Sequence, residues 1–179
     1  MPDAKGNISK LKKHKKSIFS LFGIGIILFF TLLACQHDPE TRNTGETMAP
    51  DFSLADLDGN SFHLGAERGK MILIIFTTTW CPVCTTFVPI YKEIQETYEK
   101  EKKFVMVNID IEEPYDRVYA FAKTNDISYQ ILLDNEGKVR KDYKIMGVPS
   151  FVLIDPEGKM ISSNIEKILD ILQTMFGHA

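Results

Sequence analysis

The fold is decided by FTTTWCPVC, residues 76–84, in which a buried strand ends and a helix begins. The strand is predicted from MILIIF, residues 71–76, a continuous run rich in β-branched residues that is typical of a strand buried on both faces. After the second cysteine, apolar residues recur at helical spacing as far as residue 100. Cys81 is therefore expected at the carboxyl end of a strand, where ligands bind in sheets of this kind.

Strands and helices alternate on both sides of this centre. Predicted strands lie at residues 52–55, 61–64, 71–76, 104–109, 130–133, 151–154 and 159–162, and predicted helices at 84–100, 114–125, 138–144 and from Asn164 onward. The first two strands flank the turn DGN, residues 58–60, and form a β-hairpin. The chain is expected to be an α/β protein with a central mixed β-sheet flanked by helices.

Composition and charge exclude several classes of protein. A length of 179 residues fits one domain with a short appendage, and three cysteines are too few for a disulfide scaffold. The net charge of −3 conceals an asymmetry, because residues 1–34 are basic and the remainder is acidic. An acidic domain has no positive field to neutralise phosphates, so nucleic-acid binding is not expected.

Residues 1–34 have the parts of an export signal, a basic cluster followed by an uncharged apolar run of 16 residues. That run is shorter than the ~20 residues that cross a bilayer comfortably. The sequence LLAC, residues 32–35, resembles a bacterial lipobox, which implies a bacterial source and lipid attachment to Cys35. The alternative is an uncleaved N-terminal membrane anchor. Residues 35–49 predict a polar tether, and residues 50–179 predict the folded domain.

Cys81 and Cys84 lie at positions i and i+3, within disulfide reach, at the start of the predicted helix. Such a pair can be half of a zinc site, a dithiol redox centre or a coincidence, and the spacing alone does not separate them. Structural zinc needs about four nitrogen or sulfur ligands. The domain offers no second C-x-x-C and no suitably placed histidine, so no metal is expected.

The position of the pair favours a dithiol centre. A thiolate near the first turn of a helix faces unpaired backbone N–H groups and the positive end of the helix dipole, which lowers its pKa. Cys81 is expected to be the helix N-cap and the exposed attacking sulfur, with Pro82 at the first helical position. Cys84 is expected to be more buried and to resolve a mixed disulfide by attacking Cys81. Trp80 is interpreted as a rim residue that shields the dithiol, and the alternative is a core aromatic.

The run at residues 76–84, followed by GVPS at residues 147–150, resembles the thioredoxin superfamily from about residue 50 to residue 176. The resemblance implies a thioredoxin-like fold with a cis peptide bond before Pro149, and it implies that the backbone of Val148 pairs with the bound substrate chain. The expected substrate-binding residues are Trp80, Pro82, Val83 and Val148.

The opening hairpin and an extra helix and strand between residues 114 and 133 resemble the TlpA/ResA branch of that superfamily. This resemblance implies a membrane-tethered, extracytoplasmic thiol:disulfide oxidoreductase without a cofactor. It further implies a reductase of protein disulfides, with apocytochrome c as one client class. A membrane protein would supply the electrons, and the enzyme would be a monomer.

Two departures from these families concern the proton chemistry of Cys84. Thioredoxin carries a buried aspartate where this chain has Ile75, and ResA-like proteins commonly carry a glutamate where it has Phe87. Glu93 is an acid on the same helix, but it is expected on a solvated face. The sequence therefore leaves open which group deprotonates Cys84.

Four other functions compete with a reductase. An oxidant or isomerase would share the fold and the dithiol. A peroxidase would place a threonine three residues before its cysteine, as Thr78 stands here, but would also want a proline at Ile74. A copper chaperone would need C-x-x-x-C and a distal histidine. In a pure binding module the dithiol would be vestigial, and Cys81→Ser would have no effect.

Overall fold

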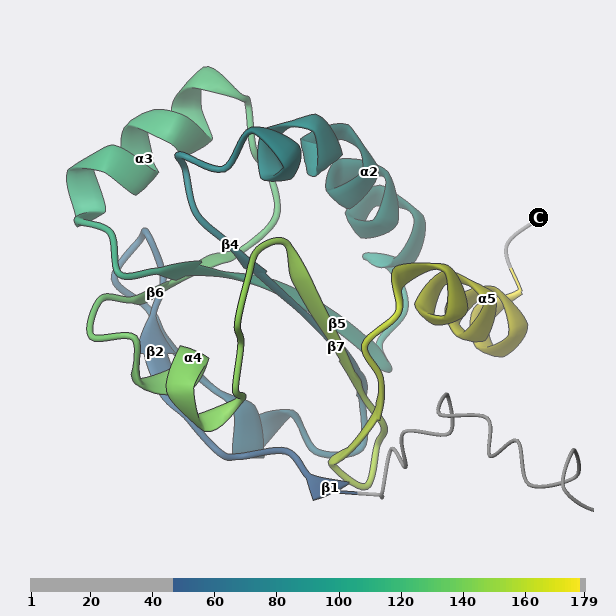
Figure 1. The fold of residues 1–179 in the computed structure, drawn as a ribbon. Coiled ribbons are helices and arrows are strands. Elements are labelled where there is room, and N and C mark those ends of the chain that lie inside the picture. Colours follow the sequence, from purple (N-terminus) through teal and green to yellow (C-terminus); the bar gives the residue numbers. More distant parts are fainter. Residues whose placement is uncertain (1–46, 178–179) are drawn as a thin grey trace, which may run out of the picture. The chain divides into compact units, whose positions relative to one another are not determined.

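The computed structural model describes residues 47–177 (Figure 1). The predicted signal segment and Cys35 lie outside the described residues, as does the tether as far as residue 46. Within the described part of the chain, no helix combines the length and the apolar character needed to cross a membrane.

A six-stranded mixed sheet forms the centre of the domain, with the strand order β1-β8-β7-β4-β5-β6. Its strands are β1 (Thr47–Met48), β4 (Met71–Thr77), β5 (Phe104–Ile111), β6 (Ile131–Asp134), β7 (Ser150–Ile154) and β8 (Lys159–Ser162). Strand β4 pairs in parallel with β5 and antiparallel with β7. All seven residues of β4 are buried, as the β-branched run predicts for a strand covered on both faces.

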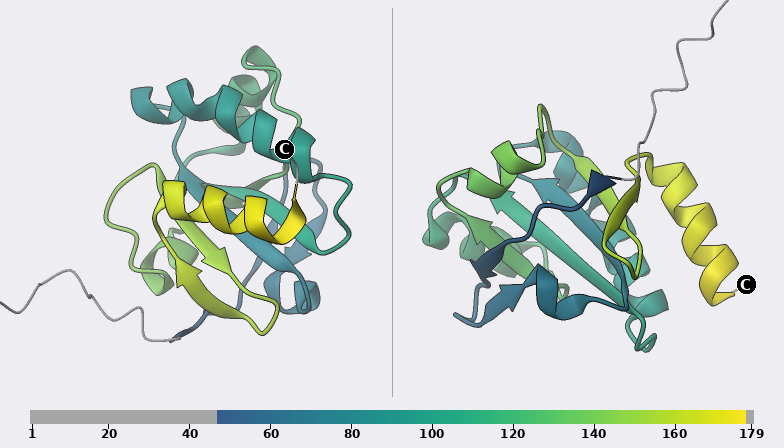
Figure 2. Two further views of the ribbon diagram at one scale, coloured as in Figure 1. Left: turned by 90° about the vertical axis from the view of Figure 1, so that its right-hand side faces the viewer. Right: turned by 90° about the horizontal axis from the view of Figure 1, so that it is seen from below.

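Alternate residues of β4 point into two separate hydrophobic cores. Leu73 and Ile75 face the core formed with α2 (Pro82–Tyr98), α3 (Tyr115–Thr124) and α5 (Ile165–Phe176). Ile72 and Ile74 face the core formed with α4 (Lys138–Asp142) and the hairpin of β2 (Ser53–Ala55) and β3 (Ser61–His63). The two layers lie on opposite sides of the sheet (Figures 1 and 2). Full burial of each such side chain contributes about 1.5–3 kcal/mol of hydrophobic free energy.

The helix that follows β4 begins as the sequence predicts. Cys81 is the N-cap of α2 and Pro82 is its first residue, where a fixed φ and a missing N–H carry no cost. Pro114 is the N-cap of α3 rather than its first residue. The side chain of Asn164 accepts a hydrogen bond from the Lys167 backbone N–H and so caps α5.

The two edges of the sheet are formed by β1 and β6. Thr47 and Met48, predicted as part of the tether, form β1 and pair antiparallel with β8, and Ala49 is buried. A strand of two residues is too short to give a periodic signal. At the opposite edge, an isolated bridge between Asp56 and Leu132 connects the hairpin to β6.

Candidate active site

The site centres on a disulfide between Cys81 and Cys84, whose Cα atoms are 5.2 Å apart. The Cys84 backbone N–H donates a hydrogen bond to the Cys81 Sγ at 3.1 Å, because the N-cap position directs this sulfur toward the first turn. Such a bond and the helix dipole both stabilise a thiolate at Cys81. Cys84 is 2% exposed and Cys81 is 5% exposed, so Cys81 is less accessible in the disulfide form than the sequence suggested.

The loop before β7 covers one side of this disulfide. The peptide bond between Val148 and Pro149 is cis. The carbonyl oxygen of Val148 lies 3.8 Å from the Cys81 Sγ, which helps to explain the low exposure of that sulfur. Val148 itself is half-buried, whereas Met146 in the same loop is 93% exposed.

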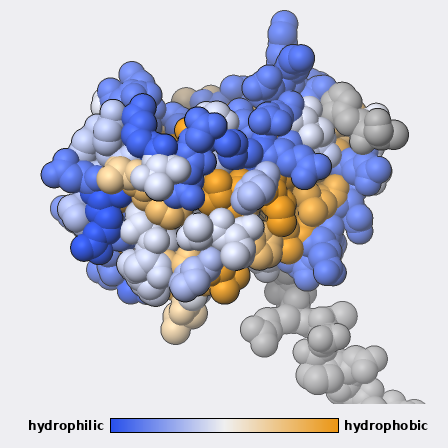
Figure 3. Space-filling model, turned by 90° about the horizontal axis from the view of Figure 1, so that it is seen from above, coloured by the Kyte–Doolittle hydropathy of each residue, from blue (hydrophilic) through white to orange (hydrophobic). Residues whose placement is uncertain are grey.

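Exposed apolar side chains flank the disulfide in the chain. Trp80 is 67% exposed, so it is not a core aromatic, and Pro82 and Val83 are also exposed. The space-filling view shows a hydrophobic area with hydrophilic borders on the side that carries α2 and α3 (Figure 3). Exposed apolar surface next to a reactive centre suits the binding of a protein chain.

The two positions at which related enzymes carry an acid are apolar in three dimensions as well. Ile75 is fully buried in the core under α2. The ring of Phe87 packs against those of Tyr91 and Phe151, with centroids 5.9 and 6.3 Å away. Glu93 is exposed, as expected. No proton acceptor for Cys84 comes from these three positions.

A small buried cavity lies behind Cys84, and it contains polar groups that the sequence did not reveal. Its volume is about 10 Å³, and Cys84, Thr78, Tyr91, Asn108 and Asp110 are among its lining residues. Three oxygens, the hydroxyls of Thr78 and Tyr91 and the Oδ1 of Asp110, are buried without a hydrogen-bond partner. Such groups are rare in folded proteins, because an unpaired buried polar atom costs free energy.

Two acidic residues, Asp110 in β5 and Glu113 just after it, lie near the junction between β4 and α2. Burial, the negative charge of Glu113 and a side-chain hydrogen bond with Glu113 raise the pKa of Asp110 to about 8, against the weaker opposing effect of Arg117. Glu113 is also buried and accepts hydrogen bonds from the backbone N–H and the hydroxyl of Thr79. The signal in the sequence was NIDIEEP, residues 108–114, in which acids occur within and directly after a buried strand.

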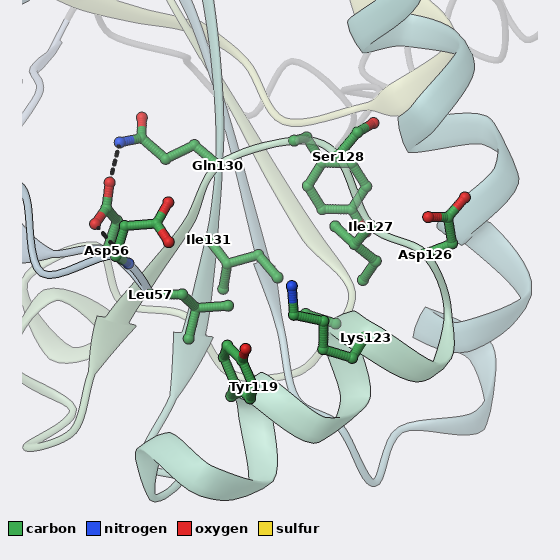
Figure 4. A pocket seen from close by; sticks show the side chains of 12 residues that line it. Asp56, Leu57, Tyr119, Lys123, Asp126, Ile127, Ser128, Gln130 and Ile131 are labelled. Carbon is green, nitrogen blue, oxygen red and sulfur yellow. Dashed lines mark hydrogen bonds between the residues drawn. The ribbon is translucent and has the colours of Figure 1, made fainter.

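A larger surface pocket adjoins this cavity and has a volume of about 430 Å³ (Figure 4). Its wall includes Tyr119 and Lys123 of α3. Ile127, Tyr129 and Ile131 line both the pocket and the buried cavity. Between residues 47 and 177, no cluster of three or more histidine, cysteine or acidic residues could hold a metal ion.

Known proteins with similar sequences include thioredoxin-like proteins and thiol-disulfide oxidoreductases. Residues 46–163 match the AhpC/TSA family. The thioredoxin-like protein YneN of Bacillus subtilis is 36% identical over 111 residues, which are 62% of this chain and 65% of YneN, just under two thirds of its length. The thiol-disulfide oxidoreductase ResA of Bacillus cereus is 31% identical over 132 residues, which are 74% of this chain and 76% of ResA.

A solved structure agrees with the fold that the sequence predicts. It is the solution structure of a protein from Bacteroides thetaiotaomicron, described provisionally as a protein disulfide isomerase. The TM-score is 0.66 and the identity is 33%, with 73% of this chain and 86% of the other covered. These findings confirm the thioredoxin-like fold. The chain belongs to the AhpC/TSA family and, within it, to the thiol-disulfide oxidoreductases of the ResA type.

Proposed function

We propose that this protein is a membrane-tethered, extracytoplasmic reductase of protein disulfides. The observation that carries the proposal is the Cys81–Cys84 pair at the N-terminus of α2, beneath the Val148–Pro149 loop. Trp80 adds exposed apolar surface beside the pair. A helix N-terminus favours the thiolate, and apolar surface favours contact with a polypeptide client.

In the proposed reaction, Cys81 is the nucleophile and Cys84 is the resolving residue. The Cys81 thiolate attacks a client disulfide, so that a Cys81–client disulfide forms while the client S–S bond breaks. Cys84 then attacks the Sγ of Cys81, the Cys81–Cys84 bond forms, and the client sulfur leaves as a thiol once it takes a proton. The client gains two electrons and two protons, and the enzyme dithiol becomes a disulfide. A dithiol protein in the membrane restores the reduced enzyme.

The client is proposed to bind as an extended chain across the loop that precedes β7. Val148 offers its backbone there, and Trp80, Pro82 and Val83 offer apolar contacts. Pro149 orients this loop against the dithiol. We propose apocytochrome c as one client class, since its cysteines must be reduced before haem is attached to them. We also propose that the enzyme is a monomer.

Attachment to the membrane is proposed through lipid on Cys35, with the domain facing the extracytoplasmic side. Two or more acyl chains give stable anchoring, because each buried methylene contributes about 0.8 kcal/mol. Labelling of cells with a radioactive fatty acid tests this assignment. The label should enter the wild-type protein and be absent from the Cys35→Ala variant, whereas equal labelling of both would refute attachment at Cys35.

The reduction potential of the Cys81–Cys84 pair tests the direction of electron flow. The full chain, purified in detergent and equilibrated with defined glutathione or dithiothreitol buffers, is expected to have a potential below about −240 mV, near that of thioredoxin. A value above about −180 mV would make the protein an oxidant or an isomerase instead.

A further inference from the structure

We propose that Asp110 accepts the proton of Cys84 when Cys84 resolves the mixed disulfide, through the polar groups of the buried cavity. This inference rests on the proposed dithiol reaction, and it adds the proton acceptor that the dithiol motif lacks. The chain has no acid at Ile75 or Phe87, although a buried thiol must lose its proton before it can attack.

The geometry of the cavity brings donor and acceptor together. Cys84 of α2 and Asp110 of β5 line the same cavity, whose volume of about 10 Å³ is on the order of the room needed for one water. The unpartnered oxygens of Thr78, Tyr91 and Asp110 belong to lining residues of this cavity. A single water bonded to these groups satisfies them and links the thiol to the carboxylate.

The hydrogen bonding of Asp110 differs from that of Asp134, a buried aspartate with a structural role. The two oxygens of Asp134 accept hydrogen bonds from the backbone N–H groups of Val139 and Arg140, and so they hold the start of α4. The Oδ1 of Asp110 has no such partner among the described residues. The Asp110 side chain is hydrogen-bonded to Glu113, but its Oδ1 is left over. Burying a carboxyl oxygen without a partner costs stability, which is a common property of groups that serve a reaction.

The electrostatic surroundings match the acceptor to the thiol. The groups that face Asp110 are Glu113 after β5, Arg117 of α3, Tyr91 and Cys84 of α2, and Tyr129 before β6. Burial raises the pKa of both tyrosines further above their ordinary range, so their hydroxyls stay neutral. The pKa of Asp110, about 8, lies close to the ordinary pKa of ~8.5 for a cysteine thiol, so proton transfer between the two groups costs little. At pH 7 about a tenth of the molecules hold Asp110 as the carboxylate that accepts the proton, and this fraction rises as the pH approaches 8.

The step is balanced without a further reactant. The Cys84 S–H bond breaks, and the proton passes through the cavity to the Asp110 carboxylate. The Cys84 thiolate attacks the Cys81 Sγ, the Cys81–Cys84 bond forms, and the client sulfur departs with the electron pair of the broken bond. Asp110 then loses its proton to solvent. The surface pocket shares Ile127, Tyr129 and Ile131 with the lining of the cavity.

Stopped-flow kinetics with 5,5′-dithiobis(2-nitrobenzoate) separate the two sulfur exchanges. The reduced full chain with Cys35→Ala has only two thiols, and it releases one thionitrobenzoate when Cys81 attacks and a second when Cys84 resolves the mixed disulfide. In Asp110→Asn we expect the first release to stay within twofold of the reference. The second release should slow at least tenfold at pH 7, because general bases contribute about 10²–10⁴-fold.

The pH profile distinguishes proton transfer from a structural effect. The rate of the second release in Asp110→Asn should equal that of the Cys35→Ala reference above about pH 10, where solvent deprotonates Cys84 without a general base. Asp134→Asn removes a different buried carboxylate and should keep both releases within twofold. Thr78→Val keeps the shape of the side chain and should slow only the second release, which tests the cavity even if Asp110→Asn fails to fold.

Each negative result points to a different error. If Asp110→Asn and Thr78→Val keep the reference rate and pH profile of the second release, Asp110 is not the acceptor, while the dithiol function stands. If the slowing persists unchanged above pH 10, the role of Asp110 is structural. If the reference protein shows a single release at every pH, as Cys84→Ser must, Cys84 does not resolve and the proposed function itself fails.

Discussion

The carboxylate of Glu113 accepts two hydrogen bonds from Thr79, one from the backbone N–H at 2.5 Å and one from the hydroxyl at 2.7 Å. Thr79 lies two residues before Cys81, so an acid that follows β5 fixes the loop that leads into α2. The Nη1 of Arg117 lies 3.4 Å from the same carboxylate, although its own side chain is largely exposed. The loop that presents the nucleophile is thus held by a residue distant in sequence.

We expect Glu113→Gln to lower the free energy of unfolding by about 1–3 kcal/mol, since it weakens buried hydrogen bonds to a charged group. The same substitution removes the negative charge beside Asp110 and should lower the pKa of that carboxyl. Urea denaturation measures the first effect. Glu93→Gln, on the exposed face of α2, should change stability by less than about 0.5 kcal/mol. Equal effects of the two substitutions would contradict this role of Glu113.

The raised pKa of Asp110 predicts a pH-dependent stability. Between pH ~4 and about 8 the unfolded aspartate has lost its proton while the folded one retains it, so unfolding releases a proton. This contribution is fully present below pH ~4 and is lost as the pH rises to about 8. Asp110→Asn lacks it, so the stability of the variant relative to wild type should rise across this range, at most by about 1.4 kcal/mol per pH unit, and level off above it. A difference that stays flat from pH 4 to 9 argues against the shift.

Cys84→Ser should trap the client. Attack by Cys81 still forms a mixed disulfide, but the residue that resolves it is missing. Turnover should fall below detection. A disulfide-linked complex of enzyme and client should appear on non-reducing gels and disappear when dithiothreitol reduces it. Cys81→Ser should abolish turnover without forming this complex. Trapping by Cys81→Ser instead would reverse the assigned roles.

Trp80→Ala should weaken the reaction with protein clients and leave the fold intact, because the side chain is 67% exposed. Truncation of an aromatic contact residue often costs 2 kcal/mol or more, so kcat/KM for a protein disulfide should fall by about tenfold or more. A small aromatic disulfide, which needs no extended contact, should react at the wild-type rate. Met175→Ala on α5 serves as the control, since Met175 is also exposed. Unchanged kcat/KM in Trp80→Ala would remove Trp80 from the binding surface.

The sequence predicted the features that depend on local pattern. The N-cap at Cys81 and the helix start at Pro82 follow from residue types within one turn, and the cap at Asn164 does so as well. The buried character of β4 follows from an unbroken apolar run. Each of these needs no knowledge of which strands become neighbours.

The features that the sequence missed depend on pairing between distant segments. In the parallel ladder of β4 and β5, Asp110 is opposite Thr77, and this register places an acid of β5 beside the cavity behind Cys84. No local pattern fixes that register. The low exposure of Cys81 has a similar origin, because the Val148 carbonyl that approaches its sulfur comes from a loop 67 residues away in sequence.

The edges of the sheet determine how readily folded copies of the domain can aggregate through strand pairing. Open strand edges act as templates for pairing between chains, and this pairing starts aggregation. In the described domain one edge is β1, only two residues long, and the other is β6, which the hairpin engages through the Asp56–Leu132 bridge. Neither edge offers a long unpaired strand to a neighbour. The folded domain is thereby protected from pairing edge to edge with other copies and growing into β-aggregates.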